Sequence, residues 1–312
     1  MANGSRHSMF QVAEATYGMT PDTPAWEPVR HNTTNVGLTK NTLQSEELRS
    51  DRQVADFRHG TRRVGGEVVS EVSYGSFDNI LEALLCGTWT EAGAAGADGD
   101  TLKAGIVRRS FSVLRHFEDL PADQKPYHLL TGIEYNTLKL AVSTEAIVKA
   151  TFGVVGKGMT MGNAAPAGST YADASTTKGM DSFTGQLLEG GSSIAVVTEI
   201  ELTLENGIEP RFVIGSKETI RPSIGRSIVT GQITAYFEAA ALLEKFVNET
   251  SSSLQFELGD LVNKYTFLIP NLKYTGGQPD IQGEGPVLLT MPFQAIYSAS
   301  EGSQIKITRG TI

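Results

Sequence analysis

Apolar and polar residues alternate along several segments of this chain, which is the pattern of strands with one buried and one solvated face. In residues 198–205 the apolar set alternates with a polar set made of Glu199, Glu201, Thr203 and Glu205. Residues 66–74 repeat the alternation, with Glu67 and Glu71 on the polar side. Helical spacing of apolar residues is confined to residues 77–85 and 238–247, and the first of these helices is expected to be capped by Ser76 and ended by Gly87. The pattern predicts a β-rich α+β fold, with few helices packed on mainly antiparallel sheets.

Two stretches of the chain read as degenerate copies of one unit. The strand-like block 66–72 precedes the first helical run, and the similar block 231–237 precedes the second. Blocks 132–135 and 147–152 recur as 271–274 and 287–293. The spacing is about 162–165 residues for the early blocks and about 139–141 for the later ones, so a deletion is expected in the second copy, opposite residues 88–103. The alternative to duplication is that the two stretches look alike only because any two β-rich domains share alternating patterns.

The repeat predicts three parts along the chain. Residues 1–34 are expected to be an extended arm, because Gly18 and three prolines interrupt regular structure there. Residues 35–178 form a first domain and residues 179–312 a duplicated second one. An arm without a core needs a surface on which its aromatic side chains can dock, and the docking candidates are Phe10, Tyr17 and Trp26.

Composition narrows the class of protein further. A chain of 312 residues with 40% hydrophobic and 20% charged residues is long enough for two ordinary globular domains. Its net charge of −9 argues against tight binding to phosphates, but not against a wall past which DNA moves freely. The single cysteine, Cys86, has no partner for a disulfide within the chain and is expected to be a small buried hydrophobe. With no apolar run of membrane-spanning length and no signal-peptide core, the protein is expected in a reducing cytoplasm.

No catalytic or metal-binding pattern is complete in the sequence. The five histidines are isolated along the chain, and His116-Phe117-Glu118 starts like a zinc deaminase motif without the cysteine pair that must follow. Residues 153–158 are glycine-rich but lack the spacing of a phosphate loop. No nucleophile elbow is present. The sequence therefore predicts a protein that is not an enzyme and has no metal or cofactor.

Several segments together resemble the major tail tube proteins of long, non-contractile-tailed bacteriophages. They span most of the chain and include Val12-Ala13-Glu14-Ala15-Thr16-Tyr17-Gly18-Met19-Thr20-Pro21, Ser45-Glu46-Glu47-Leu48-Arg49-Ser50-Asp51-Arg52, Ser73-Tyr74-Gly75-Ser76-Phe77-Asp78 and Thr198-Glu199-Ile200-Glu201-Leu202-Thr203-Leu204-Glu205-Asn206-Gly207. The resemblance implies two tandem β-sandwich or half-barrel domains, each flanked by one helix, whose inner sheets join side by side in rings. Such rings stack into a virion tail tube through which DNA is ejected.

The resemblance and the duplication together imply the partners. If six tube domains close a ring, two domains per chain make the ring a homotrimer with pseudo-sixfold symmetry. A homohexamer whose second domains decorate the outside is the alternative. The resemblance also implies contacts with tail terminator, distal tail and tape-measure proteins, assembly in the host cytoplasm, transient passage of DNA without specific binding, and no membrane.

Two further sets of site residues follow from strand phase and charge. The lumen-lining candidates are the carboxylates on the polar strand faces, Glu67, Glu71, Glu199, Glu201 and Glu205. The charged segment 49–63 is expected to be a loop between rings, with contact candidates Arg49, Asp51, Arg52, Asp56 and Arg58. A carbohydrate-binding or adhesin-like β-protein is the second hypothesis, and it would need clustered exposed aromatic side chains.

Overall fold

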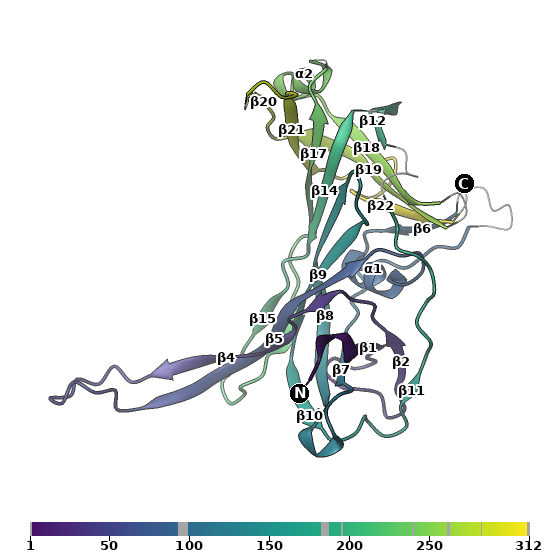
Figure 1. Ribbon diagram of the computed structural model, residues 1–312. Coiled ribbons are helices and arrows are strands. Elements are labelled where there is room, and N and C mark those ends of the chain that lie inside the picture. The colour runs from purple at the N-terminus through teal and green to yellow at the C-terminus, as the bar shows by residue number, and fades with distance from the viewer. Residues whose placement is uncertain are drawn as a thin grey trace.

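The computed structural model of the chain describes residues 2–92, 99–181, 187–194, 196–238, 240–260, 263–281 and 283–310. Strands dominate it, with two α-helices and two 3₁₀ turns (Figure 1). The first half contains η1 (Gly4–Arg6), β1 (His7–Ala13), β2 (Ala25–Pro28), β3 (Thr33–Thr34), β4 (Gly37–Gln44), β5 (Phe57–Glu71), α1 (Asp78–Leu85), β6 (Asp100–Lys103), β7 (Phe111–Phe117), η2 (Ala122–Gln124), β8 (Tyr127–Ser143), β9 (Lys149–Gly156), β10 (Gly158–Gly162) and β11 (Thr170–Tyr171). The second half contains β12 (Leu187–Glu189), β13 (Ser192–Ser193), β14 (Val197–Glu205), β15 (Glu209–Arg211), β16 (Ile220–Ser223), β17 (Ile228–Tyr236), α2 (Ala241–Val247), β18 (Ser252–Gly259), β19 (Lys264–Tyr274), β20 (Pro279–Asp280), β21 (Leu288–Ala295) and β22 (Lys306–Arg309). The predicted β-rich α+β fold is confirmed.

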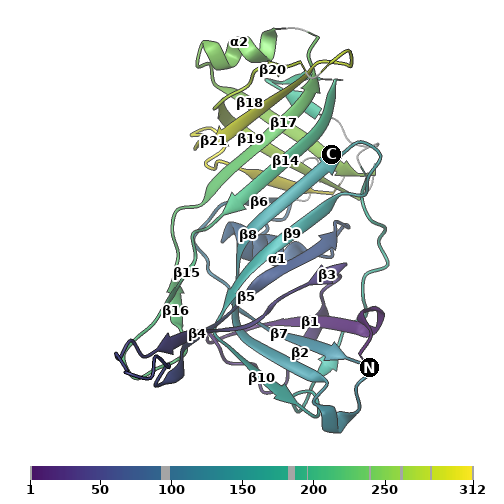
Figure 2. The ribbon, with the colours of Figure 1, turned by 60° about the vertical axis from the view of Figure 1, so that its left-hand side comes forward.

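One long antiparallel sheet runs through both halves of the molecule. Its central ladder is β5–β9–β8–β14–β17–β21, in which β14 pairs with β8 of the first half and with β17 of the second. Strand β8 is long enough to serve two layers. Its start pairs with β7 and β10, and its end pairs with β9 and β14. Figure 2 shows the ladder rising from the first half at the bottom to the second half at the top.

The strand pairings of the second half repeat those of the first. In the first half β2–β1–β7–β8 forms one run, and β3 and β4 pair with β5, which continues to β9 and β8. In the second half β13–β12–β18–β19 forms the matching run, and β14 pairs with β17, which continues to β21, β20 and β19. The registers agree as well, because Val64 and Val68 of β5 occupy the positions that Val229 and Ile233 occupy in β17. All four side chains are buried.

Each half carries one helix between corresponding strands. Helix α1 begins at Asp78 and buries its apolar stripe, as the spacing predicted. Its ends differ from the prediction: Ser76 makes no capping bond to the helix and instead accepts a hydrogen bond from Ser73, and the left-handed residue at the C-terminus is Cys86, with a φ of 49°, rather than Gly87. Cys86 is buried, as predicted. Helix α2 is shorter than expected and packs Leu242 and Phe246 against the core.

Polar contacts fasten the second half to α1. Arg309 of β22 forms ion pairs with Asp78 of α1 and with Asp100 of β6, and its guanidinium lies 4.6 Å from the Trp89 ring centroid. The hydroxyl of Tyr265 donates a hydrogen bond to the same Asp78 carboxylate. The β6 strand lies in the segment 88–103, where the extra residues of the first copy were expected. Residues 93–98 of that segment lie outside the described residues, and β6 pairs with β22.

Residues 1–34 are not the extended arm that the sequence predicted. Strand β1 pairs with β7 over its whole length and with β2, and β3 pairs with β5. Gly18, Pro21 and Pro24, which suggested an irregular arm, lie between β1 and β2, and Pro28 is the last residue of β2. Pairing with distant strands, which local sequence does not reveal, makes the segment part of the first half.

The charged segment 49–63 is also only partly a loop. Its second part, from Phe57, belongs to β5, which forms a long hairpin with β4 that projects from the body (Figure 1). We call β4, β5 and the residues between them the projecting hairpin. Residues 45–56 form its tip.

Candidate functional surfaces

The five predicted lumen-lining carboxylates lie on one side of the long sheet. Residues opposite each other in neighbouring strands point to the same side. Glu67 of β5 is opposite Gly153 of β9, which is opposite Thr137 of β8, which is opposite Glu205 of β14. Glu67 and Glu205, from different halves of the chain, therefore share a side.

The other three carboxylates follow from the same register. Glu71 of β5 is opposite Lys149 of β9, which is opposite Ala141 of β8, which is opposite Glu201 of β14. Glu199 lies two residues before Glu201 on the same strand. Since strand side chains alternate in direction, all five point the same way. We call this side of β5, β9, β8, β14, β17 and β21 the polar face. Its remaining positions are mostly hydroxyl and amide residues, namely Thr137, Thr151, Thr203, Thr230, Gln232, Thr234, Thr290 and Gln294.

Three lysines also lie on the polar face and offset part of its negative charge. They were not among the residues predicted from the sequence. Lys149 lies opposite Glu71, and Lys273 reaches this side through its partner Gln294. Lys139 lies 4.0 Å from a Glu67 carboxylate oxygen. Alternation along β8 and β9 gives the side on which their lysines lie only when both strands are known to be neighbours of β5. Which strands are neighbours is a property of the tertiary structure. The surface is therefore mixed rather than uniformly acidic, with five carboxylates, three lysines and the exposed Arg63, which lies four residues before Glu67 on β5.

The opposite side of the same sheet is apolar and forms the core. Leu138 and Leu204 form a register pair there, as do Leu140 and Leu202. All four are buried in the main hydrophobic cluster. One layer of the sheet therefore separates a continuous core from a continuous polar face.

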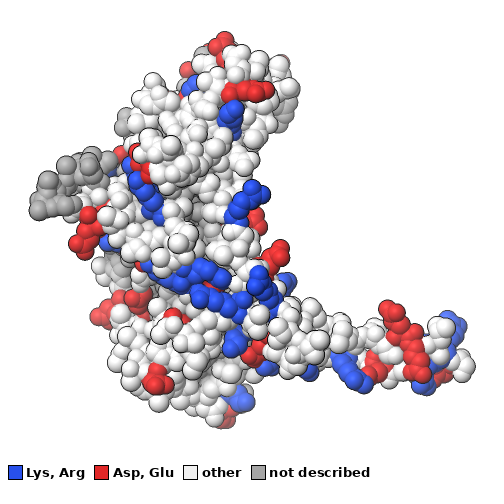
Figure 3. All heavy atoms as spheres, turned by 180° about the vertical axis from the view of Figure 1, so that it is seen from behind, with Lys and Arg blue, Asp and Glu red and all other residues white. Residues whose placement is uncertain are grey.

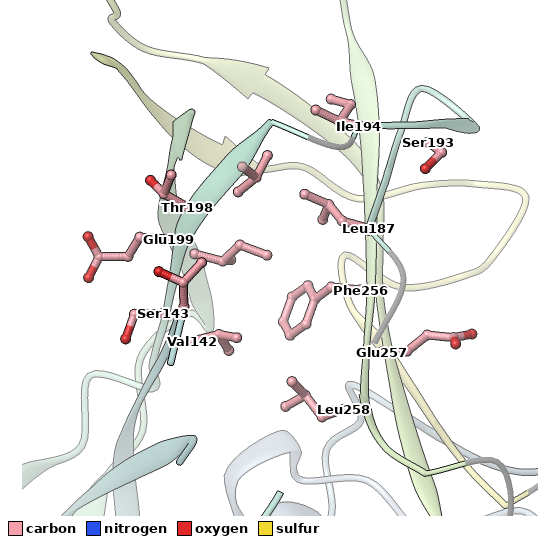
Figure 4. A pocket seen from close by; sticks show the side chains of 13 residues that line it. Val142, Ser143, Leu187, Ser193, Ile194, Thr198, Glu199, Phe256, Glu257 and Leu258 are labelled. Carbon is pink, nitrogen blue, oxygen red and sulfur yellow. The ribbon is translucent and has the colours of Figure 1, made fainter. Parts of the chain in front are cut away.

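A cavity of ≈ 530 Å³ lies on the core side of β14, between this strand and β18 (Figure 4). Phe256, Leu258 and Leu187 point into it, whereas Glu199 and Glu257 point away. The cavity is thus lined mainly by apolar groups, and its nearest carboxylates serve other surfaces. Among the described residues, no group of three or more His, Cys, Asp or Glu side chains could hold a metal ion.

Both signs of charge occur on the projecting hairpin (Figure 3). Two of its ion pairs join near neighbours, Arg49 with Asp51 at 2.7 Å and Arg58 with Asp56 at 2.5 Å. The hydrogen bond from Arg49 lowers the pKa of the Asp51 carboxyl. The tip also exposes Leu48, whose surface is 99% accessible. Exposed ion pairs contribute little to stability, so the hairpin is held mainly by its ladder and its tip is free to contact another molecule.

The three arm aromatics dock within their own chain. Trp26 is fully buried and its indole N–H donates to Ser169 Oγ at 2.8 Å. Phe10 makes an edge contact with the ring of Tyr171, and Tyr17 lies beneath the guanidinium of Arg221. Trp26 and Phe10 therefore contact residues of the first half, whereas Tyr17 also contacts Arg221 of β16 in the second half.

Histidines that are isolated in the sequence meet at the edge of β1. Arg115 Nε donates to His7 Nε2 at 3.1 Å, so the proton of a neutral His7 lies on Nδ1, which is 2.8 Å from His31 Nε2. His31 Nδ1 then donates to the Val29 carbonyl at 3.0 Å. Burial, followed by the charge of Arg115, lowers the pKa of His7 to about 4. His7 is therefore neutral and links Arg115 to His31 through hydrogen bonds.

A carbohydrate-binding or adhesin-like protein would need clustered exposed aromatic side chains, so the positions of the two tryptophans bear on that hypothesis. Trp26 is buried and Trp89 lies under Arg309, so neither tryptophan is presented as part of an open binding platform. Within the described residues, no helix is long and apolar enough to cross a membrane.

The chain matches a known protein family over nearly its whole length. The profile of a family described as phage tail tube protein matches residues 4–295, which is nearly the whole chain. A comparison with curated proteins gives no match.

Proposed function

Since the chain belongs to the phage tail tube protein family, and is thereby a structural protein of the virion tail, we propose that it self-assembles into rings that stack into a long, non-contractile tube. The tube is the conduit for DNA ejection. The observation that carries this proposal is the β8–β14 pairing, which gives both halves one shared sheet with one polar and one apolar side. In a ring, the apolar side faces the sandwich interior and the polar face lines the lumen.

The two halves act as duplicated tube domains with a boundary near Gly179. The support is the matched order and register of their ladders, from β1 to β10 in the first half and from β12 to β22 in the second. Two domains per chain favour a ring of three chains with pseudo-sixfold symmetry. A ring of six chains with the second domains outside fits less well, because β14 continues the same ladder as β8.

Strand number supports more than one chain per ring. The sheet on the polar face contributes eight strand positions per chain, β3 with β4, then β5, β9, β8, β14, β17, β21 and β20. Barrels of about 8 strands are filled by their own side chains, whereas larger barrels leave aqueous channels. Three chains would supply about 24 strands, enough for a wide lumen.

The mixed polar face suits a conduit. Duplex DNA carries one charge per ~1.7 Å, and a strongly basic wall would hold it. A wall of hydroxyls, amides and nearly balanced charges offers few lasting phosphate contacts. DNA passes transiently, without specific binding.

The projecting hairpin contacts the next ring. Its exposed tip carries Leu48 and the charged candidates Arg49, Asp51, Arg52 and Asp56, and the candidate Arg58 follows at the start of β5. These charged residues fix the register between rings. Tail terminator, distal tail and tape-measure proteins are the further partners by resemblance, and assembly takes place in the host cytoplasm.

Electron microscopy of the purified protein tests this function. Rings and stacked tubes are expected, with three-fold symmetry and six similar lobes in end views. Monodisperse single chains at all protein and salt concentrations, in a protein whose circular dichroism shows folded strands, would contradict it.

A further inference from the structure

The sheet behind the polar face ends in two unpaired edges. One edge is formed by residues 33–39, in β3 and the start of β4, which pair only with β5 among the described strands. The other is formed by residues 276–281, around β20, which pairs only with β21 among them. Free edges are normally covered or blocked, because unpaired backbone groups promote association.

The chain itself contains a pairing between the counterparts of these two edges. Residues 199–205 of β14 occupy the place of residues 33–39, since Ile200 is opposite Ile233 as Thr34 is opposite Val68. Residues 137–142 of β8 occupy the place of residues 276–281. Tyr135 is opposite Val154 of β9 as Tyr274 is opposite Phe293 of β21. Within the chain, these counterparts pair as β8–β14.

We propose that residues 276–281 of one chain pair antiparallel with residues 33–39 of the next chain in the ring, in the register that β8 and β14 use within one chain. Transfer of that register places Gly37 opposite Gln278, Val36 opposite Pro279 and Thr39 opposite Gly276. The occupant of each edge is therefore a second copy of this chain. The inference rests on the ring assembly proposed above and specifies its junction.

Burial supports this junction. Ile281 is 76% exposed, whereas its counterpart Val142, which lies at the internal junction, is 8% exposed. Leu38 is only partly buried, whereas its counterpart Leu204 is 1% exposed. Both apolar side chains lie on the core side of the sheet and become covered when the edges meet.

The backbone at the first edge fits the residue placed opposite it. Asn35 N–H donates to Glu67 O at 3.1 Å, so Asn35 points to β5 and the next residue, Val36, points its backbone groups to the free edge. The residue opposite Val36 is Pro279, which has no N–H to donate. Val36 O therefore receives no hydrogen bond from Pro279. Arg115 Nη1 donates to Val36 O instead, at 2.6 Å. Pro279 also discourages unwanted pairing of its edge before assembly.

Cysteine cross-linking tests the register. By the same alternation Gly37 and Gln278 form a non-hydrogen-bonded pair, with Cα atoms ~4.5 Å apart, a distance that a disulfide can span. A Cβ on Gly37 would meet only Asn35 O, at 3.8 Å, so Gly37→Cys fits. The probe is the full-length Gly37→Cys/Gln278→Cys chain, assembled under reducing conditions, oxidised, and run on a denaturing gel without reductant. Native Cys86 is buried and is present in every variant.

Two matched controls define the result. Lys139→Cys/Thr203→Cys places the same disulfide at the internal junction and should cross-link within a single chain. Thr39→Cys/Gln278→Cys is two residues out of register and should cross-link at least tenfold less than the test pair. A mixture of the Gly37→Cys and Gln278→Cys single variants should give dimers, which shows that the bond joins two chains.

The outcomes separate the junction from the ring assembly. Covalent dimers and trimers, with nothing larger, are expected from the test pair. Rings that are visible by microscopy but cross-link no better than the out-of-register control would overturn the junction and leave the proposed function standing. A ladder that extends to six chains would keep the junction and overturn the three-chain ring. If the test pair prevents assembly, Thr39→Cys/Gly276→Cys replaces it, with the same expected products. If the unmodified chain forms no rings, both proposals fail.

Discussion

The polar face yields a quantitative prediction about DNA retention. Changing Glu199, Glu201 and Glu205 to lysine leaves the apolar side of β14 intact, because the altered side chains all point to the polar face. Besides Arg63, the face then carries two carboxylates and six lysines in place of five carboxylates and three lysines. In a ring of three chains this adds about nine lysines around the lumen, and each can neutralise a phosphate.

The expected effect is binding with a strong salt dependence. A site that makes about 6–10 phosphate contacts loses ~10³–10⁵ of its affinity between 50 and 200 mM salt. Assembled tubes of the triple lysine variant should therefore retain a fluorescent duplex in co-sedimentation at 50 mM salt and release most of it at 200 mM. The unmodified tubes should retain little at either concentration. A phage carrying the variant should eject DNA slowly, with a defect that eases as salt rises.

Matched charge changes on the other side of the sheet provide the control. Helix α2 packs on the core side, so Glu244 and Glu249, which are exposed on it and just after it, lie away from the polar face. Changing these two to lysine adds four positive charges, against six in the polar-face variant, and should not retain DNA. Equal retention by both variants, or no retention by the polar-face variant at 50 mM salt, would refute the assignment of the lumen.

Three other predictions address assembly and stability. Arg52→Glu with Arg58→Glu should shorten tubes while rings persist, because the projecting hairpin serves stacking; loss of rings and tubes in parallel would argue for a role in ring closure. Trp26→Ala should lower the free energy of unfolding by about 3–5 kcal/mol in denaturant titrations, since a fully buried indole is lost, and Trp26→Phe by less; a change below ~1 kcal/mol would mean that the N-terminal strands are not part of the folded core. The lowered pKa of His7 means that the folded state resists protonation, so stability should fall as pH drops from about 6.5 to about 4. In the His7→Gln variant the midpoint temperature of thermal unfolding should change less with pH over this window. An unchanged pH dependence of the midpoint would exclude His7 as the titrating group.

Much of the β-rich fold was predictable because its signals are local. Alternation in β14 and β17 and the apolar stripe of α1 each lie within one element, so the sequence identified them with small errors at the ends. The wrong cap assignment at Gly87 has a physical reason. Glycine is the usual left-handed residue after a helix, but here Cys86 adopts that conformation one residue earlier.

The candidate site was predictable only in part. Strand phase selected Glu67, Glu71, Glu199, Glu201 and Glu205 for a polar face, and the register brings them to one side of one sheet. Their role in the lumen remains a prediction. The accompanying lysines were missed because phase within a strand does not say which strand lies next to it.

What the sequence determined by itself was the set of elements, their polar and apolar sides, and the similarity of two halves. Those properties depend on residues close together in the chain. Only the tertiary structure decided that β1 joins β7 instead of forming an arm, and that β14 joins β8 to give one sheet. Pairings between distant strands depend on which free backbone edges and apolar faces meet in three dimensions, and periodicity along the chain carries no record of that choice.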